Sequence, residues 1–373
     1  MERERGLPNP DKKRILIVDD AVVVRRMLSD ALAEDSSLEV AGTASNGRIA
    51  LAKFASLKPD LILLDIEMPE MDGLETVREL RKLDPRVPII MFSTLTERGA
   101  LTTLEALSLG ASDYVTKPSN VDIAATLHAI SLELLPKIRA LCHLPELPTS
   151  SIPSPKSRVA APSLTLPCRP RIMSAPQILA IGVSTGGPDA LARLLPKLPA
   201  NFPIPVVIAQ HMPAIFTSLL AARLSAKSAL PVRECVSGEP LMSGSAVIAP
   251  GDFHMVVHRE DGVIRLRTHQ GPKENFCRPS VDVLFRSVAS VYEGRVLAVV
   301  LTGMGQDGLR GCEVLRNLGS RIYVQDEASS VVWGMPGFVA KSGLADKILP
   351  LDQMGPEIVR AAIAPMAAAR SSM

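Results

Sequence analysis

Short apolar runs alternate with helix-length amphipathic stretches in two separate parts of the chain. In the first part the apolar runs cover residues 15–18, 61–64, 89–92 and 114–116, with a weaker run at 38–41. In the second part strands are predicted over 178–183, 205–209, 245–249, 254–258, 295–301 and 321–324, and helices over 189–195, 215–225, 280–290 and 308–318. Such alternation is typical of parallel sheets that carry helices on both faces. It predicts an α/β protein with two doubly wound parallel-sheet domains.

A proline-rich segment separates the two parts. Its X-Pro pairs, such as Leu147-Pro148 and Leu166-Pro167, cannot continue a helix or a central strand. A chain of 373 residues is long enough for two domains with separate cores. The sequence predicts a first domain over 12–135, a linker over 136–176 and a second domain over 177–366. A linker of this length allows the domains to touch but does not force them to.

Composition excludes several classes of function. The net charge is +2 and aromatic residues make up 3%, so neither a nucleic-acid surface nor a base-stacking platform is expected. Strands and glycine-rich loops follow the linker where a transcription factor would need a helix-turn-helix. The five cysteines lack metal-ligand spacing, which favours reduced thiols in a cytoplasmic protein. No apolar run is long enough to cross a bilayer, so membrane insertion is not expected.

Charged residues stand at the ends of three predicted strands in the first domain. Asp19 and Asp20 follow the first strand, Asp65 ends the third and Lys117 ends the fifth. In a doubly wound sheet these ends meet at the crevice where ligands bind. Clustered carboxylates repel one another unless a hard cation such as Mg²⁺ is bound. Lys117 can then hold a phosphoryl group, and Asp65 is the natural acceptor of that group.

Residues 14–135 resemble a response-regulator receiver domain, which has a flavodoxin-like fold. The resemblance rests on Asp19, Asp20, Asp65, Ser93, Lys117-Pro118 and the segment 68–73. It implies that a histidine kinase phosphorylates Asp65 and that Glu67 offers its backbone carbonyl to the Mg²⁺ ion. It also implies that Ser93 hydrogen-bonds the phosphoryl group and that Tyr114 is the aromatic residue that follows its movement.

In the second domain, Ser184 lies in a glycine-flanked turn between a predicted strand and a predicted helix. Such a turn exposes the hydroxyl near backbone N–H donors, which suggests acyl transfer. His211 directly follows the next strand and is the best candidate for the base, whereas His254 is at most a supporting residue and His269 is expected in a charged loop. Asp307 lies among glycines just beyond a later strand and can orient the imidazole.

The chain order Ser–His–Asp differs from the order in α/β-hydrolases, so that fold is not assigned. Instead, residues 177–366 resemble the catalytic domain of the protein-glutamate methylesterases of chemotaxis, a three-layer Rossmann-like domain. The resemblance rests on segments 182–188, 210–213, 278–285, 301–308, 325–330 and 334–336.

This resemblance implies that Ser184, His211 and Asp307 are nucleophile, base and orienting carboxylate. Backbone N–H groups of Thr185 and of the Met304 loop would then hold the oxyanion. The implied substrates are glutamate γ-methyl esters of methyl-accepting chemoreceptors, and the same groups could deamidate receptor glutamines. The esterase chemistry would need no cofactor. The receiver would block the active site until Asp65 is phosphorylated.

Two alternatives remain. The glycine-rich turns at 182–188 and 303–308 could cradle a nucleotide phosphate, which would make the protein a receiver-gated binding module. The same esterase could also act on a target outside chemotaxis.

Overall fold

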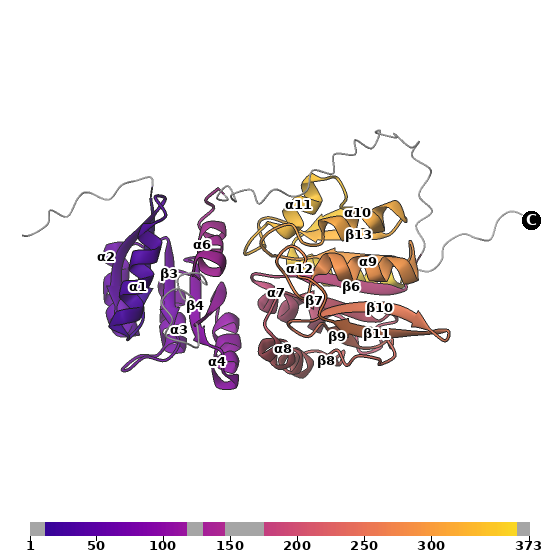
Figure 1. The fold of residues 1–373 in the computed structure, drawn as a ribbon, viewed down its shortest axis with the longest axis horizontal. Coiled ribbons are helices and arrows are strands. Elements are labelled where there is room, and N and C mark those ends of the chain that lie inside the picture. The colour runs from indigo at the N-terminus through magenta and orange to yellow at the C-terminus, as the bar shows by residue number, and fades with distance from the viewer. Residues whose placement is uncertain (1–11, 118–129, 146–174, 364–373) are drawn as a thin grey trace, which may run out of the picture.

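The computed structural model describes residues 12–117, 130–145 and 175–363, which form two α/β domains side by side (Figure 1). Each domain has a fully parallel sheet with helices on both faces. The predicted fold class is therefore confirmed. The linker segment 146–174 and Pro118 lie outside the described residues.

The first domain contains a five-stranded sheet in the order β2-β1-β3-β4-β5. Its strands are β1 (Lys13–Val18), β2 (Leu38–Ala44), β3 (Leu61–Asp65), β4 (Ile89–Thr94) and β5 (Asp113–Lys117). Helices α2 (Gly47–Leu57), α3 (Gly73–Leu83) and α4 (Glu97–Ser108) cover one face, and α1 (Val22–Ala33), η1 (Ile130–Leu134) and α6 (Leu135–Leu141) lie on the other. The chain turns in opposite directions after the adjacent strands β1 and β3, so the crevice opens between them.

The second domain contains a seven-stranded sheet in the order β14-β13-β12-β6-β7-β9-β8. The strands are β6 (Ile178–Val183), β7 (Val206–Gln210), β8 (Val232–Glu234), β9 (Ala246–Ile248), β12 (Val296–Val300), β13 (Arg321–Gln325) and β14 (Lys347–Leu349). Helices α7 (Gly187–Leu194), α8 (Ala214–Lys227) and α12 (Leu351–Ile363) pack on one face, with the short η2 (Leu195–Lys197) after α7, and α9 (Val281–Tyr292), α10 (Leu309–Asn317) and α11 (Met335–Lys341) lie on the opposite side. The crevice of this sheet lies between β6 and β12.

The structure differs from the sequence-based expectation in three places. Residues 135–141, which the sequence assigns almost entirely to the linker, form α6, because Leu135, Ile138 and Leu141 make an apolar stripe at helical spacing that is buried on the receiver sheet. Strands β8 and β14 were not predicted, since each has three residues of which at least one is charged. His269 does not lie in a loop but ends β11 (Val263–His269).

Strand β11 pairs antiparallel with β10 (His254–Glu260), and the hairpin stands apart from the parallel sheet. The hairpin exposes charged residues on one side and buries Leu266 on the other. This alternation of charged and apolar residues is typical of a half-exposed strand. The charged residues of β11 account for the expectation of a loop around His269.

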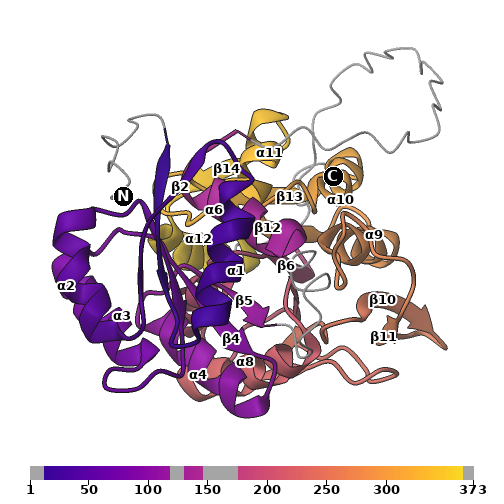
Figure 2. The same cartoon turned by 60° about the vertical axis from the view of Figure 1, so that its left-hand side comes forward.

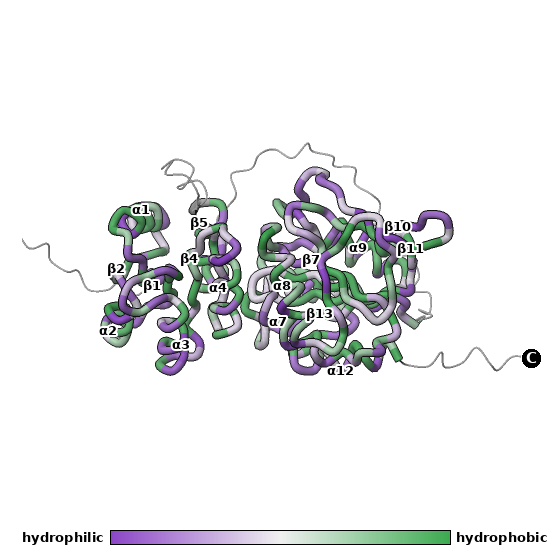
Figure 3. Tube along the Cα trace, turned by 90° about the horizontal axis from the view of Figure 1, so that it is seen from below, coloured by the Kyte–Doolittle hydropathy of each residue, from purple (hydrophilic) through white to green (hydrophobic). Residues whose placement is uncertain are grey.

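The two domains share an apolar interface. Helix α4 of the receiver contacts α7 and α8 of the second domain (Figure 1), and Figure 2 shows α4 beside α8 from a second side. The ring of Tyr114 stacks on the ring of Phe216 with centroids 4.6 Å apart. One continuous cluster of buried apolar residues runs from the receiver into the second domain. In Figure 3 apolar segments gather inside the second domain and hydrophilic segments lie along its outer loops.

Candidate active site

The crevice of the receiver holds the predicted acidic cluster. Lys117 Nζ lies 2.7 Å from Asp65 Oδ2 and 3.0 Å from Asp19 Oδ2. Asp19 and Asp65 are buried, whereas Asp20 and Glu67 are exposed. Burial raises the pKa of Asp65 to about 6, because the opposing effect of Lys117 is incomplete and the charge of Asp19 adds to the rise. This site therefore carries more negative charge than its one lysine neutralises.

Ser93 and Tyr114 of the receiver make contacts to residues outside the acidic cluster. Ser93 is fully buried, where it accepts a hydrogen bond from Thr103 Oγ1 at 2.7 Å and faces the start of α4. Tyr114 is buried against Phe216 of the second domain, and Lys137 Nζ lies over its ring. Tyr114, the aromatic residue expected to move with the phosphoryl group, is therefore part of the domain interface.

Ser184 lies at the crevice of the second domain, directly after β6. Its backbone N–H donates to Thr302 O at 3.0 Å, and its carbonyl accepts from Gln210 Nε2 at 3.0 Å. The turn then passes through Gly186 at a φ of +76°, a conformation that favours glycine, and α7 begins. A Cβ added to Gly303 would lie 2.8 Å from the Ser184 Cβ, so only glycine fits beside the serine.

Asp307 is held by the N-terminus of α9. Its carboxylate accepts hydrogen bonds from the backbone N–H groups of Val281, Asp282 and Gly308, from Ser280 Oγ and from Asn275 Nδ2. Burial raises the pKa of Asp307, but the hydrogen bond and charge of His211, together with these donors, hold that pKa well below its usual range. The N–H groups of a helix N-terminus favour a negative charge in this position. The Asp307 side chain is therefore a fixed, ionised acceptor.

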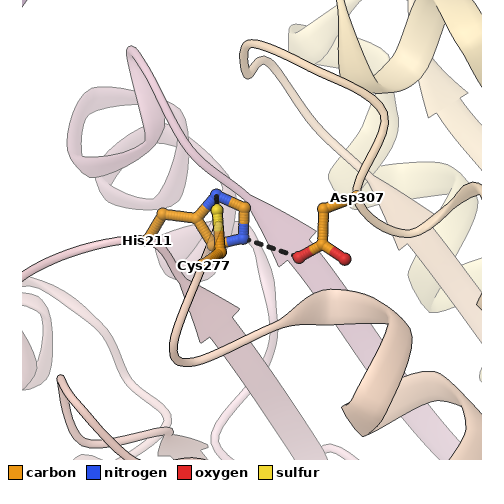
Figure 4. A group of neighbouring side chains, drawn as sticks. All are labelled: His211, Cys277 and Asp307. Atoms are coloured by element: carbon orange, nitrogen blue, oxygen red, sulfur yellow. Dashed lines mark hydrogen bonds and ion pairs between the residues drawn. The ribbon is translucent and has the colours of Figure 1, made fainter. Parts of the chain in front are cut away.

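The imidazole of His211 contacts both Asp307 and Cys277, and in Figure 4 the Cys277 side chain overlaps the ring while Asp307 lies to one side. His211 Nε2 is 2.8 Å from Asp307 Oδ2, and Cys277 Sγ is 3.4 Å from His211 Nδ1. An ionised carboxylate only accepts hydrogen bonds, so Nε2 carries the proton. In the neutral ring Nδ1 is consequently the basic atom. Burial lowers the pKa of His211, but Cys277 and Asp307 outweigh burial and raise it to about 10.

Ser184 and His211 follow the ends of two adjacent strands, β6 and β7. The two strand ends are joined by a hydrogen bond from the His211 N–H to the Val183 carbonyl at 3.2 Å. Within the described part of the chain, however, Ser184 Oγ makes no hydrogen bond to the imidazole. The structure thus joins two of the three predicted catalytic side chains and places the third at the adjacent strand end. Catalytic hydrogen bonds are often formed only once substrate is bound.

Thr185 and Met304 lie on the side of this site that faces the receiver. Thr185 Oγ1 donates to Asp113 Oδ2 of the receiver at 2.7 Å, and both groups are buried. Met304 packs on a cluster made largely of receiver residues. Asp113 also pairs with Lys137 at 3.1 Å. A receiver carboxylate is therefore bonded to the residue that follows Ser184.

Sequence reasoning missed several residues that surround the His211–Asp307 pair. Ser280 and Asp282 lie inside segment 278–285, which the sequence links only to the family resemblance, and Asn275 and Cys277 directly precede that segment. His254, expected at most as a supporting residue, accepts a hydrogen bond from Ser280 N–H through its Nδ1 atom at 3.2 Å and so lies behind the Asp307 pocket. No local pattern marks Cys277, because its contact with His211 joins residues 66 positions apart.

Comparisons with known proteins agree with this arrangement. The family model of the CheB methylesterase matches residues 179–358, and the model of the response regulator receiver domain matches residues 15–128. A protein-glutamate methylesterase/protein-glutamine glutaminase of Trichodesmium erythraeum (strain IMS101) is 51% identical over 355 residues, covering 94% of this chain and 99% of that protein. The chain therefore belongs to the CheB methylesterase family, in the form in which a receiver precedes the esterase domain.

Two further proteins are similar to this chain. A protein of the same name from Nocardioides sp. (strain ATCC BAA-499 / JS614) is 49% identical and covers 93% of this chain and 94% of its own length. The crystal structure of the Thermotoga maritima CheB methylesterase catalytic domain is 39% identical, covers 50% of this chain and 99% of its own, and has a TM-score of 0.49.

The family match leaves no support for the nucleotide-binding alternative, which would also need a lysine beside the loop at 182–188. Among the described helices, none combines the length and apolar character that a membrane crossing requires.

Proposed function

We propose that the protein hydrolyses glutamate γ-methyl esters of chemoreceptors and deamidates receptor glutamines. Ser184 Oγ attacks the ester carbonyl while His211 Nδ1 takes its proton, and methanol leaves with that proton. Water then hydrolyses the acyl-enzyme by the same route. The observation that carries the proposal is the His211–Asp307 pair at 2.8 Å, placed beside Ser184 at the crevice of the sheet.

The backbone N–H groups of Thr185 and Met304 are proposed to hold the oxyanion. Among the described contacts neither group donates a hydrogen bond, so both are available as donors. Each lies in a turn that follows one of the two strands flanking the crevice, β6 and β12. The loss of one such donor costs about 3–4 kcal/mol of transition-state stabilisation in other enzymes.

In the receiver, Asp19, Asp20 and Asp65 are proposed to hold Mg²⁺, with the backbone carbonyl of Glu67 as a further ligand. Ligand oxygens of the three aspartates lie within 4.8 Å of one another, and a hard cation prefers such an all-oxygen set. The ion would neutralise charge around an incoming phosphoryl group. Asp65 is the proposed acceptor from a histidine kinase, and Lys117 is placed to pair with the phosphoryl group. Ser93 is proposed to turn from α4 and donate a hydrogen bond to it.

Phosphorylation of Asp65 is proposed to release the active site from the receiver. The domains enclose a cleft of about 440 Å³ that is lined on one side by Arg81 and Leu107 and on the other by Gly186 and Val331. Beside this cleft, Asp113 of the receiver bonds to Thr185, and Met304 packs on receiver residues. The receiver thus covers the turns next to Ser184 and is proposed to move before a chemoreceptor binds.

The test is methanol release from methylated receptor in a cytoplasmic extract and with purified components. Wild-type protein should release methanol, faster with a small-molecule phosphodonor and Mg²⁺ present. Ser184→Ala should lose activity by about 10⁴-fold or more, because no other hydroxyl replaces the nucleophile. The matched control is Ser218→Ala, which changes an exposed serine of α8. Methanol release by Ser184→Ala at the control rate would exclude this nucleophile, and release from a different methylated protein alone would move the target outside chemotaxis.

A further inference from the structure

Cys277 is held beside His211 by a tight turn. Glu274 and Cys277 exchange two backbone hydrogen bonds, at 2.9 and 3.1 Å, and the two residues between them have positive φ angles. Asparagine at the first of these positions, Asn275, tolerates that conformation, but Phe276 at the second is a strained choice. Phe276 points into solvent and is 93% exposed, whereas Asn275 and Cys277 point inward.

The environment of Cys277 differs from that of the other described cysteines. Cys142, Cys235 and Cys312 are buried, and burial raises the pKa of each thiol, to about 12 for the first two. Cys277 is half-exposed and lies 3.4 Å from a basic ring nitrogen. A thiol that is accessible and next to an imidazole is the kind that forms a reactive thiolate, whereas deeply buried thiols are inert.

The same three side chains could in principle hold a metal ion, since the ligand atoms of His211, Cys277 and Asp307 lie within 4.8 Å of one another. In the contacts that the structure shows, Asp307 bonds to Nε2 and Cys277 contacts Nδ1, the other nitrogen of the ring. A metal ion bound through Nε2 would have to replace the hydrogen bond between His211 and Asp307. The contacts therefore link a thiol, an imidazole and a carboxylate directly.

We propose that Cys277 is a redox modification site, at which hydroperoxides reversibly switch off the esterase. The inference rests on the proposed function in one respect, namely that His211 Nδ1 is the base for Ser184. Because Asp307 occupies Nε2, Nδ1 is the only nitrogen that can take a proton from Ser184, and Cys277 already contacts it. Any group added to this sulfur is therefore placed at the catalytic base.

The chemistry uses groups that are already in contact. Nδ1 takes the proton of the Cys277 thiol, and the thiolate attacks one oxygen of the hydroperoxide. An S–O bond forms and the O–O bond breaks, so that the sulfur loses two electrons and the peroxide gains them. The leaving hydroxide or alkoxide takes the proton from Nδ1, and the products are a sulfenic acid and water or an alcohol. A small thiol reverses the change through a mixed disulfide.

The sulfenic oxygen then occupies the Nδ1 side of His211 and competes with Ser184 for the base. Neither Asp307 nor the fold has to change, so the effect is a reversible loss of activity without unfolding. The raised pKa of His211 agrees with this coupling, since Cys277 is the first group that opposes the effect of burial.

The test treats the full chain with hydrogen peroxide in the presence of a metal chelator. Oxidised sulfurs are trapped with a 1,3-dione and assigned by peptide mass spectrometry, and methanol release is followed in parallel. The esterase rate of wild-type protein should fall at least about tenfold as Cys277 becomes labelled. Dithiothreitol should restore the rate. Cys277→Ala should keep its own starting rate after the same peroxide treatment. Cys235→Ala, which changes a buried cysteine of the same domain, should stay sensitive.

A second variant tests the pairing itself. In His211→Asn the thiol lacks its base, and alkylation of Cys277 by iodoacetamide at pH 7 should slow by about tenfold relative to wild type. Labelling of Cys277 no faster than that of Cys235, or equal peroxide sensitivity in Cys277→Ala, would overturn the proposal. These labelling rates do not depend on esterase activity. A protein that releases no methanol at all would therefore refute the proposed function while the reactivity of Cys277 is still measured.

Discussion

Asp65 and Asp307 lie at the same end of two similar sheets, but their pKa values shift in opposite directions. Each is a buried aspartate beside the crevice of a doubly wound parallel sheet. The pKa of Asp65 is raised to about 6, whereas the pKa of Asp307 is held well below its usual range. Topology therefore places a carboxylate but does not decide its chemistry. The neighbouring charges and N–H donors decide it.

The neighbours of the two carboxylates explain the difference. Asp65 shares one lysine with a second buried aspartate, Asp19, so its charge is only partly compensated. Asp307 receives three backbone N–H groups, two further side-chain donors and the imidazole. An incompletely compensated carboxylate is suited to binding a cation and a phosphoryl group. A fully compensated one is suited to holding an imidazole in one orientation for many turnovers.

The largest expected effect comes from exchanging the carboxylate of Asp307 for an amide. Asp307→Asn should lower the esterase rate by about 10⁴-fold, since an amide can donate to Nε2 and so leave the ring in the wrong tautomer. Asp65→Asn should instead abolish phosphorylation by acetyl phosphate, measured by intact mass, and keep a basal esterase rate. If Asp307→Asn lost less than tenfold, the contrast between the two carboxylates would not hold.

A smaller effect is expected at the contact between the domains. Asp113→Ala removes the acceptor of Thr185, and a buried hydrogen bond to a charged group is worth about 1.5–3 kcal/mol. The unphosphorylated protein should therefore release methanol about tenfold faster than wild type. Asp30→Ala changes an exposed aspartate on the far helix α1 and serves as the control. A basal rate that falls, or that equals the control, would count against inhibition by the receiver.

The pH dependence of the esterase tests the state of His211. Because its folded pKa is raised to about 10, the neutral base becomes more abundant as pH rises from 7 toward that value, and kcat/KM should rise with it. The stabilising contribution of the imidazolium is present below the ordinary pKa of histidine and is lost as pH rises through the folded one. Cys277→Ala removes one cause of the raised pKa of His211, so the pH profile of its kcat/KM should move to lower pH by about one unit. Superimposable profiles would show that the thiol does not affect the base.

The smallest effect concerns Mg²⁺ and stability. The raised pKa of Asp65 means that its ionisation destabilises the fold as pH rises from about 4 through about 6. At pH 7.5 a saturating concentration of Mg²⁺ should offset the destabilising charge of Asp65. The free energy of unfolding should then increase by roughly 2–3 kcal/mol, seen as a rise in melting temperature. At pH 5 the ion must displace a proton, and the rise should largely disappear. Asp65→Asn is the control and should show little Mg²⁺ effect at either pH, while a rise that is the same at both values in wild type would be unexpected.

The sequence was sufficient to predict features that repeat locally. The central strands, the helices between them and the strand-end positions of Asp65, Ser184 and His211 all follow from apolar runs and the residues that end them. It was less informative where few residues carry the pattern, as in β14, or where charges decorate a half-exposed strand, as in β11.

Contacts between distant segments could not be predicted from the sequence. The turn that brings Cys277 to His211 depends on loop geometry, and the bond from Thr185 to Asp113 depends on how two separately folded domains meet. Neither leaves a periodic signal, because each joins single residues that are far apart along the chain. The tautomer of His211 likewise becomes clear only when the partners of both ring nitrogens are known.

The apolar cluster that continues from one domain into the other has a thermodynamic consequence. Separation of the domains wets the faces of Tyr114 and Phe216 and the α4 surface around them. Newly hydrated apolar surface raises the heat capacity of a protein. Activation by a phosphodonor should therefore increase the heat capacity of the protein, which calorimetry can measure. The activated enzyme should also self-associate more readily than the resting one.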